Sequence, residues 1–406
     1  MQFDASGNRA RVDALRSRGV EVWGSERVYI GEDVDLQAIE RGAVIRYATL
    51  SGRRLSVASG AVIGTSGHAE VHDCQIGRDV ELGSGLYHGA TFLQGVKVRG
   101  FAEIRPETLL EEQAEAAHNV ALKNTTFTSC CVAGSLINFC DLFLSGGRSR
   151  RDHTEIGSGA IHFNFDPRGD KWGSLIGGIR GVLMQSDPVF IGGNCGLVGP
   201  LEVGFGSVTA AGSVIRKNVG ENMLVASHSH SLITKRIRPS EYGSLRSRFG
   251  VTAKLIGTLR ALDAWYGLVR APRAHDGEGR LYEAARGRIN AQIAERIRRL
   301  ERIIEKLPQK TGQRTRGRTP SREHRVLVDG WGSLRRALET SVDPREPPRE
   351  FLEPYIRARD AGKSHLDAIK SAEAGAPQAA RWLDGLVEHV TARANQAISP
   401  VPTGSF

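Results

Sequence analysis

Aliphatic residues recur along residues 155–219 at intervals of five or six, or after a loop, and most are followed by glycine or another small residue. The positions that set this repeat are Ile156, Ile161, Ile191, Leu197, Val203, Val208 and Val214. A six-residue repeat is typical of a parallel β-helix, in which each coil is built from short strands. We expect one aliphatic side chain per strand to point inward, so that stacked coils share one continuous core.

The same repeat runs in a looser form through residues 28–105. Glycines fall where the coils are expected to turn, including Gly31, Gly77, Gly83 and Gly100, and we expect positive φ angles there. The pattern predicts a β-helix over residues 28–235. A short helix over residues 9–19 indicates an N-terminal cap over residues 1–27.

After residue 240 the apolar spacing becomes helical. The clearest helix spans residues 281–307, where Ile289, Ile293, Ile297, Leu300, Ile304 and Leu307 form one apolar stripe before Pro308. We expect packing on a neighbouring helix rather than a coiled coil across a trimer. The pattern predicts a helical region over 236–308, a basic linker over 309–326 and further helices over 327–406. Their role is open between an oligomer cap, a lid and a partner surface.

Composition narrows the class of protein. A chain of 406 residues predicts two or three units. The net charge of +10 suits anionic partners, but arginine-rich helices explain it equally well, so nucleic acid is not the expected partner. Five cysteines without CxxC spacing predict reduced thiols in the cytoplasm. No apolar run reaches the ~18 residues of a membrane helix, and no signal-peptide core is expected.

The repeat is interrupted by polar and aromatic residues from His162 to Lys171. Asn164 and Phe165 stand in this interruption, in the sequence His-Phe-Asn-Phe-Asp. An amide side chain can accept from an amine and donate to an oxygen, so Asn164 could bind a ligand. It could instead be a structural asparagine of the β-helix.

Residues 28–222 resemble the acetyltransferase domain of the bacterial bifunctional N-acetylglucosamine-1-phosphate uridylyltransferase/glucosamine-1-phosphate acetyltransferase and its archaeal relatives. The resemblance is carried in order by residues 102–106, 118–123, 157–166, 190–200, 208–212 and 219–222. It implies a left-handed parallel β-helix, a homotrimer with sites between subunits, and acetyl transfer from acetyl-CoA to an amino-sugar phosphate without a metal.

The resemblance also implies roles for particular residues. Arg105 and Lys123 match residues that face the sugar phosphate, Asn164 and Phe165 match residues that contact the sugar, and Lys171 matches a second substrate lysine with one residue inserted. The coils that face acetyl-CoA supply the expected cofactor contacts Gly159, Ala160, Gly193, Ala211 and His228.

The sequence departs from that family at the general base. Ser135 stands where the family has histidine, and an unassisted serine is a poor proton acceptor. Two insertions follow, over residues 142–152 and 179–188, and no nucleotidyltransferase domain precedes the coils, so uridylyl transfer by that mechanism is not expected. We hypothesise that His153 replaces the lost base, with His162 as the next candidate, beside Asn164. Either histidine could instead be structural. The arginines of the first insertion, Arg148, Arg150 and Arg151, are either solvated or hold a phosphate of CoA or a nucleotide.

The predicted function is acetyl transfer from acetyl-CoA to the amine of a phosphorylated or nucleotide-linked amino sugar. Two alternatives remain. One is a scaffold or ligand-binding protein that retains the coils and has lost the base. The other is a sugar-nucleotide enzyme of different chemistry.

Overall fold

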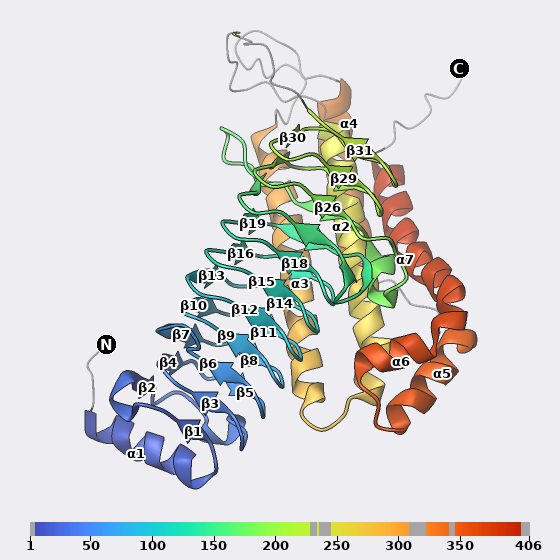
Figure 1. Cartoon of the computed structure of the whole chain (residues 1–406). Helices are drawn as coiled ribbons and strands as arrows, with labels where there is room; N and C mark the ends of the chain where they lie inside the picture. The colour runs from blue at the N-terminus through green and yellow to red at the C-terminus, as the bar shows by residue number, and fades with distance from the viewer. Residues whose placement is uncertain (1–4, 228–233, 235–244, 308–321, 341–345, 399–406) are drawn as a thin grey trace, which may run out of the picture.

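The computed structural model of the chain describes residues 5–227, 234, 245–307, 322–340 and 346–398. The first half is a stack of triangular coils, and helices from the second half run along one side of it (Figure 1). His228 and most of the predicted basic linker lie outside the described residues.

Three parallel sheets form the sides of the stack, which we call sheets A, B and C. Sheet A holds β1 (Glu21–Val22), β3 (Val44–Ile45), β6 (Val62–Ile63), β9 (Glu81–Leu82), β12 (Lys97–Val98), β15 (Glu115–Ala116), β18 (Val132–Ala133), β23 (Glu155–Ile156), β26 (Phe190–Ile191), β29 (Val208–Thr209) and β31 (Leu224–Val225). Sheet B holds β2 (Val28–Ile30), β4 (Ala48–Ser51), β7 (Ala69–His72), β10 (Gly85–His88), β13 (Ala102–Ile104), β16 (Ala121–Lys123), β19 (Asn138–Cys140), β24 (Ile161–Phe163), β27 (Gly196–Val198) and β30 (Val214–Ile215). Sheet C holds β5 (Ser56–Val57), β8 (Gln75–Ile76), β11 (Thr91–Phe92), β14 (Leu109–Leu110), β17 (Thr126–Phe127), β20 (Leu142–Leu144), β25 (Ser174–Ile176) and β28 (Glu202–Val203).

The chain visits the sheets in the order A, B, C and then returns to A one coil further on. We call the three corners the A–B edge, the B–C edge and the C–A edge. The architecture is the left-handed parallel β-helix with an α-helical extension that the sequence predicts. The stack begins at β1, because Glu21 and Val22 already pair with β3.

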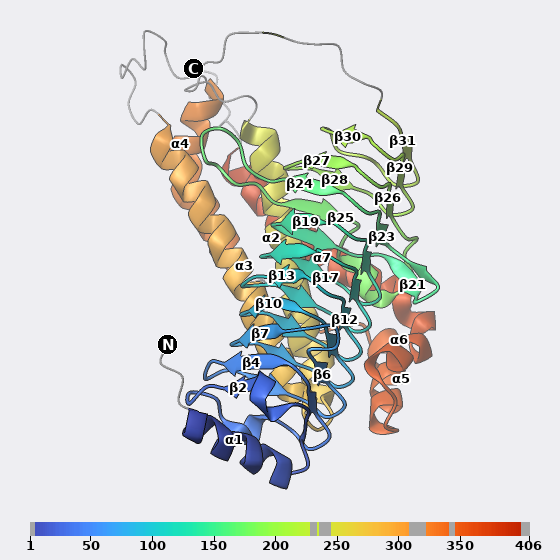
Figure 2. The same cartoon turned by 60° about the vertical axis from the view of Figure 1, so that its left-hand side comes forward.

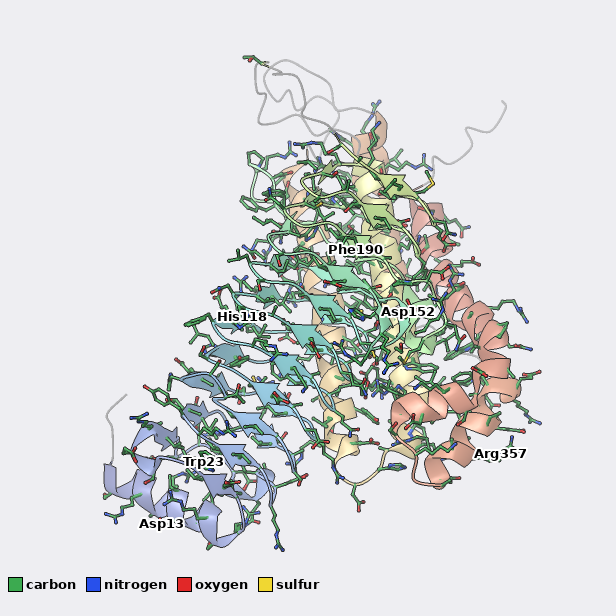
Figure 3. The ribbon with its side chains drawn as sticks, in the orientation of Figure 1. Asp13, Trp23, His118, Asp152, Phe190 and Arg357 are labelled. Carbon is green, nitrogen blue, oxygen red and sulfur yellow. The ribbon has the colours of Figure 1, made fainter. Side chains whose placement is uncertain are left out.

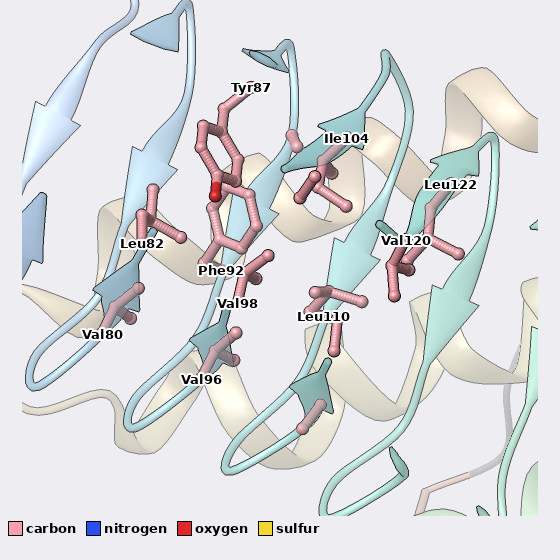
Figure 4. Close-up of a cluster of buried hydrophobic side chains, with 14 of the residues drawn as sticks. Val80, Leu82, Tyr87, Phe92, Val96, Val98, Ile104, Leu110, Val120 and Leu122 are labelled. Carbon is pink, nitrogen blue, oxygen red and sulfur yellow. The ribbon is translucent and has the colours of Figure 1, made fainter. Parts of the chain in front are cut away.

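Inward-facing side chains of successive coils form one apolar column (Figure 4). The repeat predicted this column for most positions, including Ile156, Ile191, Leu197 and Val203, which are all buried. It was wrong at three others, Ile161, Val208 and Val214, which face outward. Because side chains alternate along a strand, the inward positions there belong to His162, Thr209 and Ile215.

The corner glycines are required for a reason other than the one expected. Gly77 and Gly83 do not have positive φ angles, whereas Asp73 and Asp79 do. A Cβ atom on Gly77 would lie 2.9 Å from the carbonyl oxygen of Phe92, and one on Gly83 would lie 2.7 Å from the carbonyl carbon of Arg99. Close stacking of neighbouring coils therefore selects glycine at these corners.

The helices and short helical turns are η1 (Ser25–Arg27), η2 (Leu36–Ala38), η3 (Ile179–Leu183), η4 (Tyr266–Arg270), η5 (Ala271–Arg273), η6 (Glu373–Gly375), α1 (Ala5–Ser17), α2 (Leu245–Trp265), α3 (Glu278–Lys306), α4 (Arg322–Glu339), α5 (Arg349–Asp360), α6 (His365–Ser371) and α7 (Ala376–Ala397). None of the helices in the described ranges combines the length and the apolarity needed to span a bilayer. Helix α1 caps the first coil, and Asn8 hydrogen-bonds the backbone of β2.

Helices α2 and α3 cover sheet C (Figure 2). The apolar stripe of α3 is buried against α2 and the coils, so the expected packing on a neighbouring helix is observed. Outward residues of sheet C such as Leu109, Phe143 and Leu175 join the helices in a second core. In the described part of the chain no helix covers the length of sheets A and B, and α1 contacts only their first strands, β1 and β2.

A buried polar contact fixes the helical layer to the C–A edge. Arg270 of η4 is fully buried, forms ion pairs with Glu111 and Glu112, and lies over the rings of Tyr266 and Tyr282. Moving the helices relative to the coils would separate this buried arginine from its two carboxylates and leave the charges unpaired. The contact therefore favours one relative position of the two layers.

The first insertion is smaller than predicted. Leu142–Leu144 is a regular strand of sheet C, β20, so the added residues are 145–154. They form a hairpin of β21 (Gly147–Ser149) and β22 (Asp152–His153), which projects from the C–A edge. The second insertion contains η3 and packs against α2 and α7.

Candidate active site

Two basic side chains occupy successive coils at the end of sheet B. Register pairs Lys123 on β16 with Cys140 on β19, and Arg105 follows β13 in line with them. Nη2 of Arg105 lies 3.3 Å from the thiol of Cys140. Burial raises the pKa of that thiol, while the positive charges of Arg105, Lys123 and Lys171 oppose the rise. Three of the predicted substrate residues thus lie close enough to act on one thiol.

Asn164 begins the loop that leads from β24 to β25 at the B–C edge, within the segment 164–173 that we call the site loop. Its side chain is nearly buried, and its amide nitrogen donates to Oδ2 of Asp141 at 2.5 Å. No partner of its carbonyl oxygen Oδ1 is recorded among the described residues, and that oxygen is not sealed from solvent.

Asp141 determines which way the Asn164 amide points. Burial raises the pKa of Asp141, but Arg299 and Arg296 reverse this effect and leave the pKa below its ordinary value. The carboxylate is therefore ionised and can only accept hydrogen bonds. It receives the amide of Asn124 at 2.5 Å in addition to that of Asn164. Asn164 must give its nitrogen to Asp141, which leaves its carbonyl oxygen to accept from a ligand.

The two other residues of the site loop that the sequence singled out, Phe165 and Lys171, are exposed. They face each other across an antiparallel bridge at the base of a turn. Between them Asp166 and Asp170 accept ion pairs from the helices, and Trp172 packs on Phe249 of α2. The loop is therefore fixed to the helical layer at several points.

His162 lies inside the coil rather than on its surface. Its Nδ1 is 2.7 Å from the carbonyl oxygen of Cys140, so this nitrogen carries the proton. Its Nε2 then accepts from the hydroxyl of Ser174 at 2.8 Å. Burial lowers the pKa of the ring. Both nitrogens are occupied within the fold, and neither faces the Asn164 carbonyl as the structure stands.

His153 lies on a different edge from Asn164. It belongs to β22 of the hairpin, with Nδ1 2.9 Å from the carbonyl oxygen of Arg150 and Nε2 3.7 Å from Glu155. The hairpin residue Asp152 and the A–B edge residue His118 lie on opposite sides of the coil stack (Figure 3). Strand β21 and helix α3 also lie on opposite sides (Figure 2). One chain alone does not bring His153 to the site loop.

The position of the missing histidine, Ser135, is at the A–B edge. Its backbone N–H donates to the hydroxyl of Ser158, and its carbonyl oxygen accepts from Gly159. Gly159, Gly193 and Ala211 occupy the same edge one, two and three coils after Ser135. These predicted cofactor residues thus form one row above Ser135, except that the side chain of Ala160 points into the core.

The arginines of the hairpin are held within the chain. Arg148 pairs with Asp152 and Asp187, and Arg150 pairs with Glu115 and donates to backbone carbonyls. The backbone N–H of Arg151 donates to the hydroxyl of Ser149, and its guanidinium contacts no hydrogen-bonding or acidic group among the described residues.

Sequence reasoning missed Asp141 and the helical residues that reach it. Helix α3 repeats a polar residue followed by an aliphatic one, at Arg288-Ile289, Gln292-Ile293, Arg296-Ile297 and Arg299-Leu300. All four polar members are buried at or beside the B–C edge. A polar stripe directly beside an apolar one was the signal that this helix packs on polar coil corners.

Known proteins resemble the coil region. No protein-family model matches the chain. The bifunctional protein GlmU of Desulfitobacterium hafniense is 32% identical over 227 residues, which are 54% of this chain and 46% of that protein. The proteins of the same name from Nitratidesulfovibrio vulgaris and Pseudomonas fluorescens are 33% identical over 186 residues (46% of this chain, 37% of that protein) and 36% identical over 136 residues (34% and 26%). The chain spans less than half the length of these relatives.

A solved structure titled as the polySia specific acetyltransferase NeuO covers 53% of this chain and 87% of that one, at 12% identity and a TM-score of 0.25. A score that low says nothing about this chain. The resemblance to hexapeptide-repeat acetyltransferases that the sequence indicated is confirmed by the curated relatives, over about half of the chain.

Proposed function

We propose that the protein transfers an acetyl group from acetyl-CoA to the amine of a phosphorylated or nucleotide-linked amino sugar. The observation that carries the proposal is the group of three cations, Arg105, Lys123 and Lys171, around Cys140, next to the Asp141 that holds the amide of Asn164. The cations suit the phosphate, and the carbonyl oxygen suits an N–H of the amine. The similarity to bifunctional GlmU proteins supports this class of chemistry.

The reaction requires one proton to leave the amine. The amine nitrogen attacks the thioester carbonyl carbon, a C–N bond forms, the C–S bond breaks, and the CoA thiolate leaves and takes up a proton. Asn164 would orient the amine, and backbone N–H groups of the coils beside it would stabilise the oxyanion. The predicted cofactor row of Gly159, Gly193 and Ala211 lies at the A–B edge, so it would hold a part of acetyl-CoA distant from the thioester.

We infer a homotrimer from where the apolar surface lies. Sheet C is covered by α2 and α3, which leaves sheets A and B to meet other copies. The large exposed apolar side chains include Phe101 and Leu136 at the A–B edge, 71% and 62% exposed, and Phe190 and Phe163 on sheets A and B. Such side chains at adjacent corners favour an interface. A threefold axis along the A–B edges would set sheet A of one copy against sheet B of the next.

That arrangement offers a source for the base. With the A–B edges at the axis, the C–A edge of one copy would approach the B–C edge of its neighbour at the same level. His153 and Asn164 belong to neighbouring levels of the stack, on those two edges. We therefore propose that His153 acts across the interface on an amine held by Asn164 of the next copy. A histidine suits this proton transfer because its unperturbed pKa is near 6.5.

The cytoplasm is the proposed location, and the five free cysteines suit a reducing compartment. The proposal is tested by incubating the protein with acetyl-CoA and a panel of amino-sugar phosphates while free thiol is measured. Asn164→Ala serves as the site variant and Arg151→Ala as a control on the exposed hairpin. We expect amine-dependent thiol release that Asn164→Ala lowers strongly without removing it and that Arg151→Ala retains. No amine-dependent release from any acceptor would contradict the proposal.

A further inference from the structure

Polar side chains of helix α3 contact the coils along the B–C edge. Arg288 contacts Gln75 and Thr91, Gln292 contacts Glu107 and Thr126, and Arg296 contacts Asn124. A step of four residues advances an α-helix by about 6 Å, which exceeds the ~4.8 Å spacing of the coils, so successive polar side chains of the helix contact successively later coils or span two of them.

The next polar side chain in this series meets the candidate site. Nη1 of Arg299 lies 2.6 Å from Oδ1 of Asp141, whose other oxygen accepts from Asn164. Nε of Arg299 donates to Glu295 at 2.8 Å, which fixes the guanidinium from behind. Arg299 thus connects the helical layer to the Asn164 amide through one carboxylate.

The same layer holds the rest of the site loop. Lys306 of α3 lies 2.6 Å from Asp170, and Arg248 of α2 lies 3.4 Å from Asp166 and packs on Trp172. The backbone N–H of Trp172 donates to the backbone carbonyl oxygen of Asn164 at 2.6 Å and closes the loop. Two helices distant in sequence therefore determine the loop's position.

We propose that Arg299 is a positioning residue: it holds the Asp141 carboxylate in place, and thereby orients the Asn164 amide with its side-chain carbonyl oxygen toward the acceptor amine. Its catalytic consequence rests on the proposed function, whereas its effect on the site loop does not. The helical extension then has a defined task, which is to pre-organise the acceptor site. Without Arg299, Asp141 loses its nearest counter-charge, and the Asn164 amide is free to turn.

The experiment compares Arg299→Gln with Arg298→Gln, its neighbour on the exposed side of α3, which pairs only with Glu295 among the described residues. Arg299→Lys serves as a rescue, since it keeps the charge. Each is made in the natural chain, and Arg299→Gln also in an Asn164→Ala background. The readouts are kcat, the KM for acetyl-CoA, and hydrogen–deuterium exchange of peptides that cover residues 162–175.

We expect Arg299→Gln to lower kcat by roughly 10-fold to 100-fold with little change in the KM for acetyl-CoA, because a misoriented group loses that much. Arg299→Lys should recover part of the loss. In the Asn164→Ala background the same change should cost less than about twofold, since residues that act through one another are not additive. Peptides 162–175 should exchange faster in Arg299→Gln and unchanged in Arg298→Gln.

Equal losses in both backgrounds would overturn the proposal, because Arg299 would then act elsewhere than through Asn164. Unchanged exchange of peptides 162–175 in Arg299→Gln would overturn it as well. If the natural chain shows no acetyl transfer, the proposed function fails, and the exchange comparison still decides whether Arg299 positions the loop.

Discussion

Nε2 of His162 lies 2.8 Å from the hydroxyl of Ser174, and this contact makes the ring part of the coil interior. The hydroxyl in turn accepts from the backbone N–H of Leu201 in the next coil. The histidine thereby links three successive coils, since its Nδ1 is bound to the carbonyl oxygen of Cys140. A histidine in this position is a structural residue first.

The histidines should separate stability from catalysis. His162→Ala leaves a cavity and two unpaired polar groups, at an expected cost of about 1–3 kcal/mol for each group. His153→Ala should leave Tm unchanged and lower kcat by roughly 10²–10⁴-fold, as loss of a general base does. Ser135→Ala should have little effect on kcat. The measurements are Tm and kcat at saturating substrates. Unchanged turnover in His153→Ala would contradict the role of His153 as the base, and water or the substrate itself would then accept the proton.

The cations predict an effect on acceptor binding alone. Arg105→Ala and Lys123→Ala should each raise the KM for a phosphorylated acceptor, because each removes a charged hydrogen bond that contributes roughly 1.5–3 kcal/mol. The KM for acetyl-CoA should change little. Arg151→Ala, at the exposed tip of the hairpin, is the control. Wild-type acceptor KM values in both variants would contradict the assignment of a phosphate site.

The proposed interface can be tested by mixing subunits. His153→Ala and Asn164→Ala disable different edges, so each homotrimer should be inactive while co-expressed chains with distinct tags regain part of the activity. Mixed trimers contain interfaces that join an intact His153 to an intact Asn164. A mixture as inactive as its parents would contradict a base supplied across the interface, and a monomer in sedimentation at micromolar concentration would contradict the assembly.

The stability that the buried contact between Arg270 and Glu111 contributes should depend on pH. Burial raises the pKa of Glu111 to about 7, although Arg270 opposes the rise. An acid whose pKa is raised on folding contributes stability at low pH and loses it as the pH rises toward that folded pKa. Glu111→Gln keeps an acceptor for the Tyr266 hydroxyl and removes the titration. Its Tm relative to the natural chain should therefore increase between about pH 5 and pH 7 and level off above.

The control for this comparison is Glu81→Gln on exposed sheet A, which should show no such trend. A Tm difference for Glu111→Gln that stays constant with pH would contradict the assignment.

The repeat predicted the fold because one coil is encoded by local spacing. Ile156, Ile191 and Leu197 mark it without reference to any distant residue. The repeat could not say which member of a strand faces inward where neighbours are both apolar or where a polar residue is buried, as at Ile161 and His162. The pairing register between neighbouring coils determines which side chain faces inward, and that register depends on contacts between coils that are distant in sequence.

The site was predictable only in part. Arg105, Lys123 and Asn164 could be named from ordered motifs. Asp141 could not, because its role depends on Arg299, which lies 158 positions further along the chain in a helix that resembles no named motif. The placement of His153 at a different edge from Asn164 could not be predicted either. The length of an insertion can be counted in the sequence, but the corner from which it projects cannot.

The measurement that tests the central claim most directly is acetyl transfer followed by mass spectrometry, with acetyl-CoA and an amino-sugar phosphate in saturating amounts. The account predicts a product heavier by one acetyl group on nitrogen, formed with one equivalent of free thiol and formed far more slowly by Asn164→Ala. No acetylated product from any amino-sugar phosphate or nucleotide-linked amino sugar, together with no saturable binding of acetyl-CoA at millimolar concentration, would contradict it and favour a scaffold that has retained only the coils.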